Sequence, residues 1–342
     1  MAICSERQRH TSYSETFLAA LFPGAYQKGQ ESRQQDVNLA GDISAPISLV
    51  QKERAVRVLI TGSAGNIGRV QVQKVREAGH AIRTFDKTAA NKGEDWEHLP
   101  GDLRDINAVR RAVQGMDAVV HLGAIPNDRN GAEDDVLSIN VQGTWNVLLA
   151  CVEAGVQRVV YYSSVNALGN FMGHRKSECL PIDDTYPRHP ITPYQLSKHL
   201  GEETCRSFTN HHGIVTICLR PVYVVNPKQY LSWREQRGTR NAEWGRGDYW
   251  AYVDVRDVCD AAMLGLTVEN VTHDAFLLTA DDTTMDTPTT ELVEQYYPDT
   301  PWVQERAAYL AENPCRSLVD CTHAKTVLGW QPKRSWRHPE IV

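Results

Sequence analysis

The feature that most constrains this chain is a run of apolar residues, 56–60, that leads directly into three glycines at three-residue spacing. A helical pattern follows over residues 66–78. A buried strand, a tight turn and a helix N-terminus in this order direct backbone N–H groups at an anion, which is how a dinucleotide pyrophosphate is held. The residues expected to form this cradle are Gly62, Gly65, Asn66, Ile67 and Gly68.

A second strand is expected at residues 81–85, and it ends at Asp86. An acidic residue about 20 positions beyond the glycines accepts hydrogen bonds from the adenosine ribose. A carboxylate there repels a 2′-phosphate, so the sequence predicts NAD, with NADP less favoured. Lys87 and Arg104 weaken this preference without reversing it.

From residue 56 onward, strand and helix patterns alternate, which predicts an α/β fold with a doubly wound parallel sheet of the Rossmann type. Further strands are expected at 117–124 and 159–162, and a long helix at 134–154. The strand 117–124 breaks at small residues, which leave room for the adenosine half of a cofactor.

The catalytic chemistry is expected further along the chain. Tyr194 and Lys198 are four residues apart at the start of a helical pattern, 194–211, so their side chains share one helix face. A phenol has a pKa near 10, and a neighbouring ammonium is expected to lower it toward the range useful for acid–base catalysis. Strand 159–162 delivers Ser163 and Ser164 to the same edge of the sheet, where a hydroxyl can stabilise charge on a reacting oxygen.

In this order the motifs resemble the extended short-chain dehydrogenase/reductase family, the NAD-dependent epimerase/dehydratase group, over residues 55–336. The resemblance selects Ser164 rather than Ser163 as the catalytic serine, because Ser164 begins the family's Ser-x-x-x-x-Gly segment. It also implies that Asn140 supports the lysine side of a proton relay. It implies substrate contacts at Ser164, Val165, Asn166 and Tyr223. To the cradle and Asp86, the expected cofactor contacts add Asp102, Leu103, Leu122, Gly123, Ala124, Asn140, Tyr194, Lys198 and Pro221.

Departures from the family pattern bear on the substrate. Tyr223 stands where sugar-nucleotide epimerases have an asparagine that contacts the substrate diphosphate, and the stretch 221–253 is short for wrapping a nucleotide. The pattern is similar to that of compact, uronate-dehydrogenase-like members acting on small free substrates. Arginines in the segment 233–240 either hold a substrate carboxylate or form a solvated charged loop.

Composition excludes several other classes. Net charge is −6, which argues against a nucleic-acid partner, and no apolar run approaches the ~20 residues of a membrane span. The spacing of the 12 histidines and eight cysteines does not suggest a metal site, and the cysteines are typical of free thiols in a cytoplasmic protein. Residues 1–54 are polar and are expected to form a disordered or loosely packed extension, with a targeting role as the alternative.

The expected domains are the extension 1–54, an NAD-binding domain over 55–220 with the catalytic residues, and a mainly substrate-binding lobe over 221–342 interleaved with late Rossmann elements. Three functions are consistent with these features: an NAD-dependent oxidoreductase acting on a small polar molecule such as a sugar or sugar acid, an epimerase or dehydratase that recycles bound NAD, and a non-catalytic NAD-binding regulatory protein. A homodimer through the helices 134–154 and 194–211 is implied by the family resemblance.

Overall fold

The computed structural model describes residues 55–88 and 96–338. The expectation for residues 1–54 lies outside this part of the chain. Residue 55 onward forms one compact unit.

The centre of this unit is a parallel sheet of seven strands in the order β3-β2-β1-β4-β5-β6-β9. Two more strands, β7 and β8, pair with each other in a separate small sheet. The strands are β1 (Arg57–Thr61), β2 (Ala81–Asp86), β3 (Glu97–Pro100), β4 (Ala118–His121), β5 (Arg158–Tyr162), β6 (Val215–Pro221), β7 (Tyr223–Val225), β8 (Tyr252–Asp254) and β9 (His273–Leu278). The doubly wound sheet expected from the sequence is therefore confirmed.

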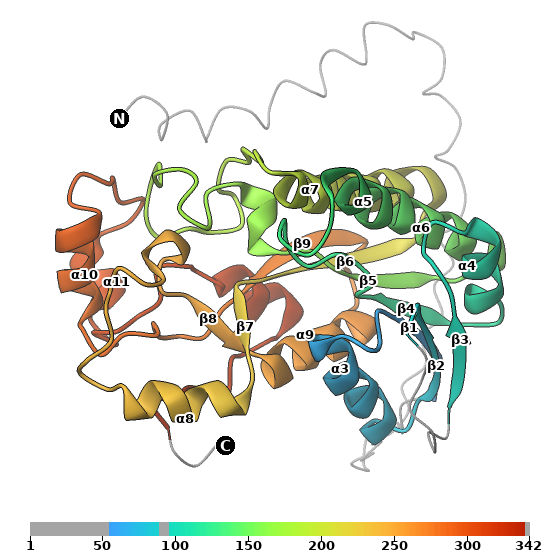
Figure 1. Cartoon of the computed structure of the whole chain (residues 1–342), viewed down its shortest axis with the longest axis horizontal. Helices are drawn as coiled ribbons and strands as arrows, with labels where there is room; N and C mark the ends of the chain where they lie inside the picture. Colours follow the sequence, from blue (N-terminus) through green and yellow to red (C-terminus); the bar gives the residue numbers. More distant parts are fainter. Residues whose placement is uncertain (1–54, 89–95, 339–342) are drawn as a thin grey trace, which may run out of the picture. The chain divides into compact units, whose positions relative to one another are not determined.

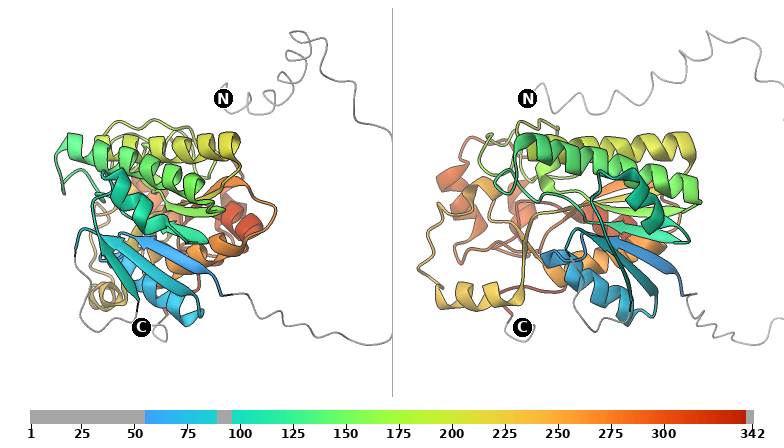
Figure 2. Two further views of the ribbon diagram at one scale, coloured as in Figure 1. Left: turned by 90° about the vertical axis from the view of Figure 1, so that its right-hand side faces the viewer. Right: turned by 45° about the vertical axis from the view of Figure 1, so that its right-hand side comes forward.

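Helices cover both faces of the sheet, with α4, α5, α6 and α7 on one side and α3 and α9 on the other (Figure 1). The same layers are visible in the two turned views of Figure 2. The helices are α3 (Asn66–Glu77), α4 (Ile106–Val113), α5 (Glu133–Leu137), α6 (Gly143–Ala154), α7 (Pro193–His212), α8 (Pro227–Glu235), α9 (Val255–Thr267), α10 (Thr289–Tyr296) and α11 (Arg306–Leu310).

Strand β1 shows why the sequence forms a sheet covered on both sides. Val58 and Ile60 belong to one apolar cluster, and Leu59 between them belongs to another. Successive strand residues point to opposite faces, so a continuous apolar run is needed when both faces are covered. Each of these fully buried side chains contributes roughly 1.5–3 kcal/mol relative to exposure.

The residues expected to form one helix, 134–154, form two α-helices, α5 and α6. A π-helical turn, Ser138–Gln142, separates α5 from α6. Asn140 lies in this turn and exchanges two side-chain hydrogen bonds with the backbone of Ile125. The turn therefore attaches the helix to the loop that follows β4, which a periodicity argument does not reveal.

The elements of the second half of the chain belong partly to the sheet and partly to a separate lobe. β9 joins the seven-stranded sheet beside β6, whereas β7, β8, α8, α10 and α11 form a lobe beyond the carboxyl ends of the sheet strands (Figure 1). In the register of the sheet, Thr61 lies opposite both Phe85 and His121, and His121 lies opposite Tyr161. The carboxyl ends of β1, β2, β4 and β5 therefore meet at one edge, which faces the lobe.

Candidate functional site

The glycine cradle lies at this edge, between β1 and α3. Gly62 has φ +69°, a conformation that glycine adopts without strain. A Cβ on Gly62 would lie 2.6 Å from the backbone nitrogen of Gly123, and a Cβ on Gly68 would overlap the carbonyl oxygen of Gly62. The loop is thus closed against β4 and against its own helix. α3 begins after Gly65 without a side-chain cap, so its first N–H groups are open to an anion.

Asp86 lies beside the cradle at the end of β2. Its carboxylate accepts hydrogen bonds from the backbone N–H of Ala64 at 3.0 Å and of Thr88 at 2.9 Å. A carboxylate fixed next to the phosphate loop is placed to accept ribose hydroxyls, as the sequence predicted. Its negative charge disfavours a 2′-phosphate at this position.

Arg104 is paired with two carboxylates at the edge of the sheet. It forms ion pairs with Asp102 at 2.7 Å and with Asp135 at 2.9 Å. The hydrogen bond from Arg104 also lowers the pKa of Asp102. The sequence treated Arg104 as a group that weakens the preference for NAD. The two ion pairs reduce that effect, because they partly neutralise the charge of Arg104.

Leu103, Leu122, Gly123 and Ala124 border the same edge. Leu103 is buried, and its side chain occupies the space that a Cβ on Gly123 would need. The hydroxyl of Thr61 accepts from the N–H of Gly123 at 3.1 Å and forms a hydrogen bond with Nδ1 of His121 at 2.7 Å. Hydrogen bonds therefore join the ends of β1 and β4. Gly123 has no side chain, which leaves room for Leu103.

Tyr194 and Lys198 project from the first turns of α7. This helix begins with a capping box between Thr192 and Gln195. Nζ of Lys198 donates to the carbonyl oxygen of Tyr162 at 2.8 Å and lies 5.9 Å from the centre of the Tyr194 ring. The lysine therefore joins α7 to the end of β5, the strand that leads into Ser163 and Ser164.

Ser164 lies next to Tyr194. Its hydroxyl forms a hydrogen bond with the Tyr194 phenol and accepts from the N–H of Asn166 at 3.2 Å, which caps the 3-10 turn Val165–Leu168. The structure therefore brings together the serine, tyrosine and lysine that the sequence predicted. Ser163, in contrast, donates to Glu202 at 2.6 Å.

The structure contradicts the lowered pKa that was expected for Tyr194. Burial raises the pKa of Tyr194 to about 12, and the hydrogen bond with Ser164 only partly opposes this. Burial also lowers the pKa of Lys198 to about 8. Both shifts have one physical cause, because a closed apolar site disfavours the charged form of either group.

Asp128 is a charged neighbour that the sequence did not reveal. Its carboxylate accepts from the backbone N–H of Tyr194 at 2.7 Å, at the N-terminus of α7, and its charge further raises the Tyr194 pKa. It comes from the loop after β4, where neither periodicity nor spacing indicates its partner.

Asn140 joins the loop after β4 to helix α7. Its amide donates to the hydroxyl of Ser197 at 3.0 Å, and its remaining bonds go to the backbone of Ile125. The contact with Ser197 brings Asn140 to the residue that precedes Lys198, and the role of Asn140 in a proton relay stays a prediction.

The expected substrate residues differ in accessibility. Val165 is buried, whereas the amide of Asn166 lies 3.4 Å from the Ser164 hydroxyl. Tyr223 is 53% exposed at the start of β7 and its hydroxyl accepts from Gln229 at 2.6 Å, while Pro221 ends the buried strand β6.

The arginines of segment 233–240 are not free to hold a substrate carboxylate. Arg234 donates to the carbonyl oxygens of Trp336 and His338, both at 2.6 Å. Arg240 donates to a backbone carbonyl and lies over the ring of Trp233, and Arg237 pairs with Asp286 at 3.4 Å. Arg234 attaches residues 336–338 to α8, and these partners within the protein weigh against the carboxylate interpretation.

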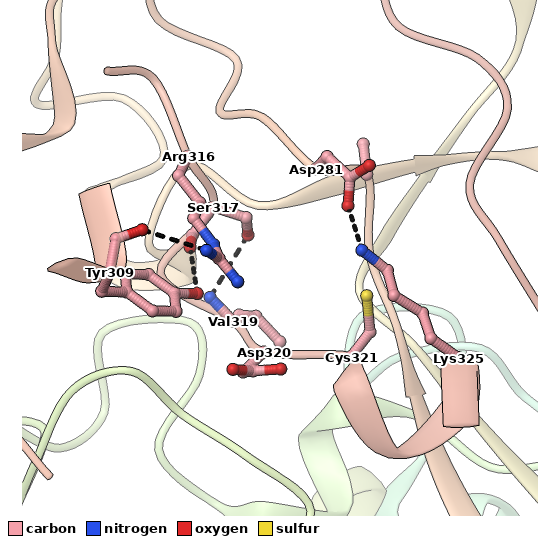
Figure 3. A pocket seen from close by; sticks show the side chains of 9 residues that line it. Asp281, Tyr309, Arg316, Ser317, Val319, Asp320, Cys321 and Lys325 are labelled. Atoms are coloured by element: carbon pink, nitrogen blue, oxygen red, sulfur yellow. Dashed lines mark hydrogen bonds and ion pairs between the residues drawn. The ribbon is translucent and has the colours of Figure 1, made fainter. Parts of the chain in front are cut away.

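A small hollow in the lobe is lined by residues that include Asp281, Tyr309, Arg316 and Lys325 (Figure 3). Its volume is about 10 Å³, and its two cations already have partners. Arg316 lies 3.9 Å from the centre of the Tyr309 ring, and Lys325 pairs with Asp281 at 2.6 Å. The hollow is too small for a metabolite, and its contacts stabilise the lobe.

No helix in 55–88 or 96–338 combines the length and apolar character that crossing a bilayer requires. In the same part of the chain, no group of three or more His, Cys, Asp or Glu side chains is arranged to hold a metal ion.

The fold and the edge geometry define a dinucleotide-binding α/β protein with a serine, a tyrosine and a lysine beside the cradle. Its sequence matches the model of the NAD dependent epimerase/dehydratase family over residues 58–276, and the chain belongs to this family. The resemblance expected from the motifs is thus confirmed, and the family's cofactor agrees with the NAD expected here.

Similar proteins include a uronate dehydrogenase of Pseudomonas syringae pv. tomato, 33% identical over 48% of this chain and 58% of that protein. A putative UDP-glucose 4-epimerase of Methanocaldococcus jannaschii is 31% identical over 50% of this chain and 57% of that protein. The matched stretch therefore spans less than two thirds of either relative. The crystal structure of a short-chain dehydrogenase/reductase superfamily protein of Agrobacterium tumefaciens with bound NAD has a TM-score of 0.64, 24% identity, and coverage of 82% of this chain and 94% of that chain. The structural likeness shows the shared fold.

Proposed function

We propose that this protein is an NAD-dependent oxidoreductase that transfers a hydride at a secondary hydroxyl or ketone of a small polar substrate, such as a sugar or sugar acid. The observation that carries the proposal is the grouping of Ser164, Tyr194 and Lys198 at the edge that holds the glycine cradle. The matched uronate dehydrogenase supports the substrate class.

The residues fit NAD in two respects. Backbone atoms fill the space that a Cβ on Gly62 or Gly68 would need, so the loop has no side chains there and its backbone can approach a pyrophosphate. Asp86 lies beside this loop, where the family's acidic residue binds the ribose. NAD, when bound, supplies the hydride acceptor for alcohol oxidation.

The protein's own groups then handle the proton. In the oxidative direction, the phenolate of Tyr194, which its raised pKa makes the minor form at neutral pH, takes the hydroxyl proton of the substrate as the C–H hydride leaves for the nicotinamide, so the alcohol becomes a ketone and the phenol is regenerated. Ser164 donates a hydrogen bond to the reacting oxygen. The Lys198 ammonium stabilises the phenolate and holds the nicotinamide ribose.

The compact lobe favours a free substrate over a sugar nucleotide. Between Arg220 and Asp254 the chain forms the short strands β7 and β8, the short helix α8 and one 3-10 turn. The arginines of this region are engaged with the protein itself. We accordingly assign the cofactor to residues 55–220 and the substrate mainly to residues 221–342, with β9 returning to the sheet.

An epimerase or dehydratase that recycles bound NAD is the second candidate, supported by the matched UDP-glucose 4-epimerase. Both candidates use the same tyrosine, and net redox change separates them. The test is NADH absorbance with NAD⁺ and a panel of uronates, aldoses and polyols, beside a UDP-sugar panel analysed for epimerised product. Accumulating NADH supports the dehydrogenase, and epimerised product without NADH supports the alternative.

We also propose a homodimer in the cytoplasm, formed through α6 and α7. The outer surfaces of these helices expose Trp145 (51%), Leu196 (37%) and Leu200 (36%). Large apolar groups gathered on a helix pair are typical of an interface.

A further inference from the structure

A buried carboxylate lies one helical turn beyond the catalytic lysine. Tyr194, Lys198 and Glu202 follow one another at four-residue intervals along α7, so they share one face of the helix. All three are buried, and Glu202 is only 2% exposed. Buried carboxylates are rare unless they are paired, so its partners indicate its role.

Glu202 connects the helix to the strand that carries the catalytic serine. One carboxylate oxygen accepts from the hydroxyl of Ser163 at 2.6 Å, and Ser163 is the neighbour of Ser164. Arg220 of β6 donates to both carboxylate oxygens, at 2.8 and 2.7 Å. This bidentate pair fixes the orientation of the carboxylate between β5 and α7.

The second side of Arg220 reaches a separate carboxylate. Its Nη1 donates to Asp184 at 3.0 Å. Asp184 and Arg220 line a hollow of about 600 Å³ at the β9 edge of the sheet. Burial raises the pKa of Asp184 to about 7, so this carboxylate is only partly ionised at neutral pH. Burial opposes the ionised form of Glu202, but Arg220 and Arg188, which lies 3.3 Å from the carboxylate, lower its pKa, so Glu202 is ionised.

Among the described groups that face the Lys198 ammonium, Glu202 is the anion. Lys198 donates to a neutral carbonyl and lies 5.1 Å from the centre of the Tyr161 ring. Phenols and thiols are neutral at pH 7, and burial lowers the pKa of His121 to about 3, so it is neutral as well. The titratable and charged groups facing Lys198 are Tyr194, Glu202 and Cys205 of α7, Tyr161 and Tyr162 of β5, Cys218 and Arg220 of β6, and His121 of β4.

We propose that Glu202 is a positioning residue of this site, whose buried carboxylate stabilises the cationic form of Lys198 and ties the end of β5 to α7 through Ser163. Arg220 keeps the carboxylate ionised and correctly oriented. Lys198 can then hold the nicotinamide ribose and stabilise the Tyr194 phenolate while it is surrounded by otherwise neutral groups. The effect of Glu202 on turnover rests on the proposed function. Its effect on the charge of Lys198 does not, because NAD⁺ binding reports that charge directly.

The test is the pH dependence of NAD⁺ affinity, measured by calorimetry for the wild type and for Glu202→Gln. Wild-type affinity is expected to fall as Lys198 loses its proton at about pH 8. Removing a neighbouring anion lowers the pKa of a cation, so the midpoint for Glu202→Gln is expected to move down by about one pH unit or more. An unchanged midpoint would overturn the proposal.

Asp184→Asn is the matched control, because it removes the other carboxylate of Arg220 from the side remote from Ser163. Both variants are expected to lower the unfolding temperature, but only Glu202→Gln is expected to move the pH midpoint. Equal shifts in the two variants would show a general effect of the ion cluster and contradict a specific role for Glu202.

Two further variants keep the test decisive. Glu202→Asp retains the charge and is expected to keep the wild-type midpoint, and a shift as large as that of Gln would count against the proposal. If Glu202→Gln does not fold, Glu202→Gln combined with Arg220→Met and Asp184→Asn removes all three charges of this buried cluster, a change that buried ionic groups often tolerate. The triple variant is expected to show the same shift as the single one. Absence of turnover on every substrate would refute the proposed function and leave this binding test intact.

Discussion

Gly62→Ala is the most direct test of the cradle, because it has two distinct destabilising effects: a strained backbone conformation and a steric clash. The alanine must adopt φ +69°, which costs about 1–2 kcal/mol for a residue with a Cβ. Its Cβ would also lie 2.6 Å from the nitrogen of Gly123, whereas ordinary contacts begin at 3.4 Å. The ends of β1 and β4 must therefore separate by about 0.8 Å, the difference between those two distances.

Both strands are held by hydrogen bonds, so this separation is an overpacking of roughly 1–3 kcal/mol. The total expected loss of unfolding free energy is about 2–5 kcal/mol. Gly79→Ala is the matched control, since Gly79 has φ +78° and nothing within 4 Å of an added Cβ. It should lose only about 1–2 kcal/mol.

Urea unfolding of the two variants measures the difference, and calorimetry measures NAD⁺ binding. Gly62→Ala should bind NAD⁺ at least about tenfold more weakly, equivalent to about 1.4 kcal/mol, and Gly79→Ala should bind like the wild type. Equal destabilisation of the two variants with unchanged NAD⁺ affinity would refute the close packing of the cradle against β4.

Three other substitutions test separate parts of the site. Asp86→Ala should weaken NAD⁺ binding and raise the NADP⁺/NAD⁺ affinity ratio by about tenfold or more, because the repulsion of a 2′-phosphate is lost; an unchanged ratio from titration calorimetry would contradict the ribose assignment. Asp128→Asn removes a charge that raises the Tyr194 pKa, so that pKa should fall and the rise of oxidation rate with pH should occur at lower pH; a shift to higher pH in the rate profile would contradict the sign. Trp145→Lys should convert a dimer to a monomer in sedimentation equilibrium with the circular dichroism spectrum retained, and a persistent dimer would place the interface elsewhere.

The sequence predicted the parts of the site that depend on local order along the chain. Gly62, Asp86, Ser164 and Tyr194 all follow strand ends or open helices, and parallel strands bring their carboxyl ends to one edge. Once the strands were placed, the meeting of these residues followed from topology alone.

Properties that depend on packing could not be predicted in the same way. The Tyr194 pKa rises because the site is closed, and the extent of burial is not written in local spacing. Arg234 bonds to carbonyl groups 102 and 104 residues further along the chain, so its partners were invisible to a motif. Glu202 lies between these cases, because its spacing from Lys198 was readable but its pairing with Arg220 was not.

The central claim is that Tyr194 exchanges the proton during hydride transfer. NADH formation by the wild type and Tyr194→Phe, on a substrate found in the uronate, aldose and polyol panel, tests it most directly. The account predicts that Tyr194→Phe loses about 100-fold or more in turnover while NAD⁺ affinity stays near the wild-type value. Full turnover by Tyr194→Phe on that substrate would contradict it.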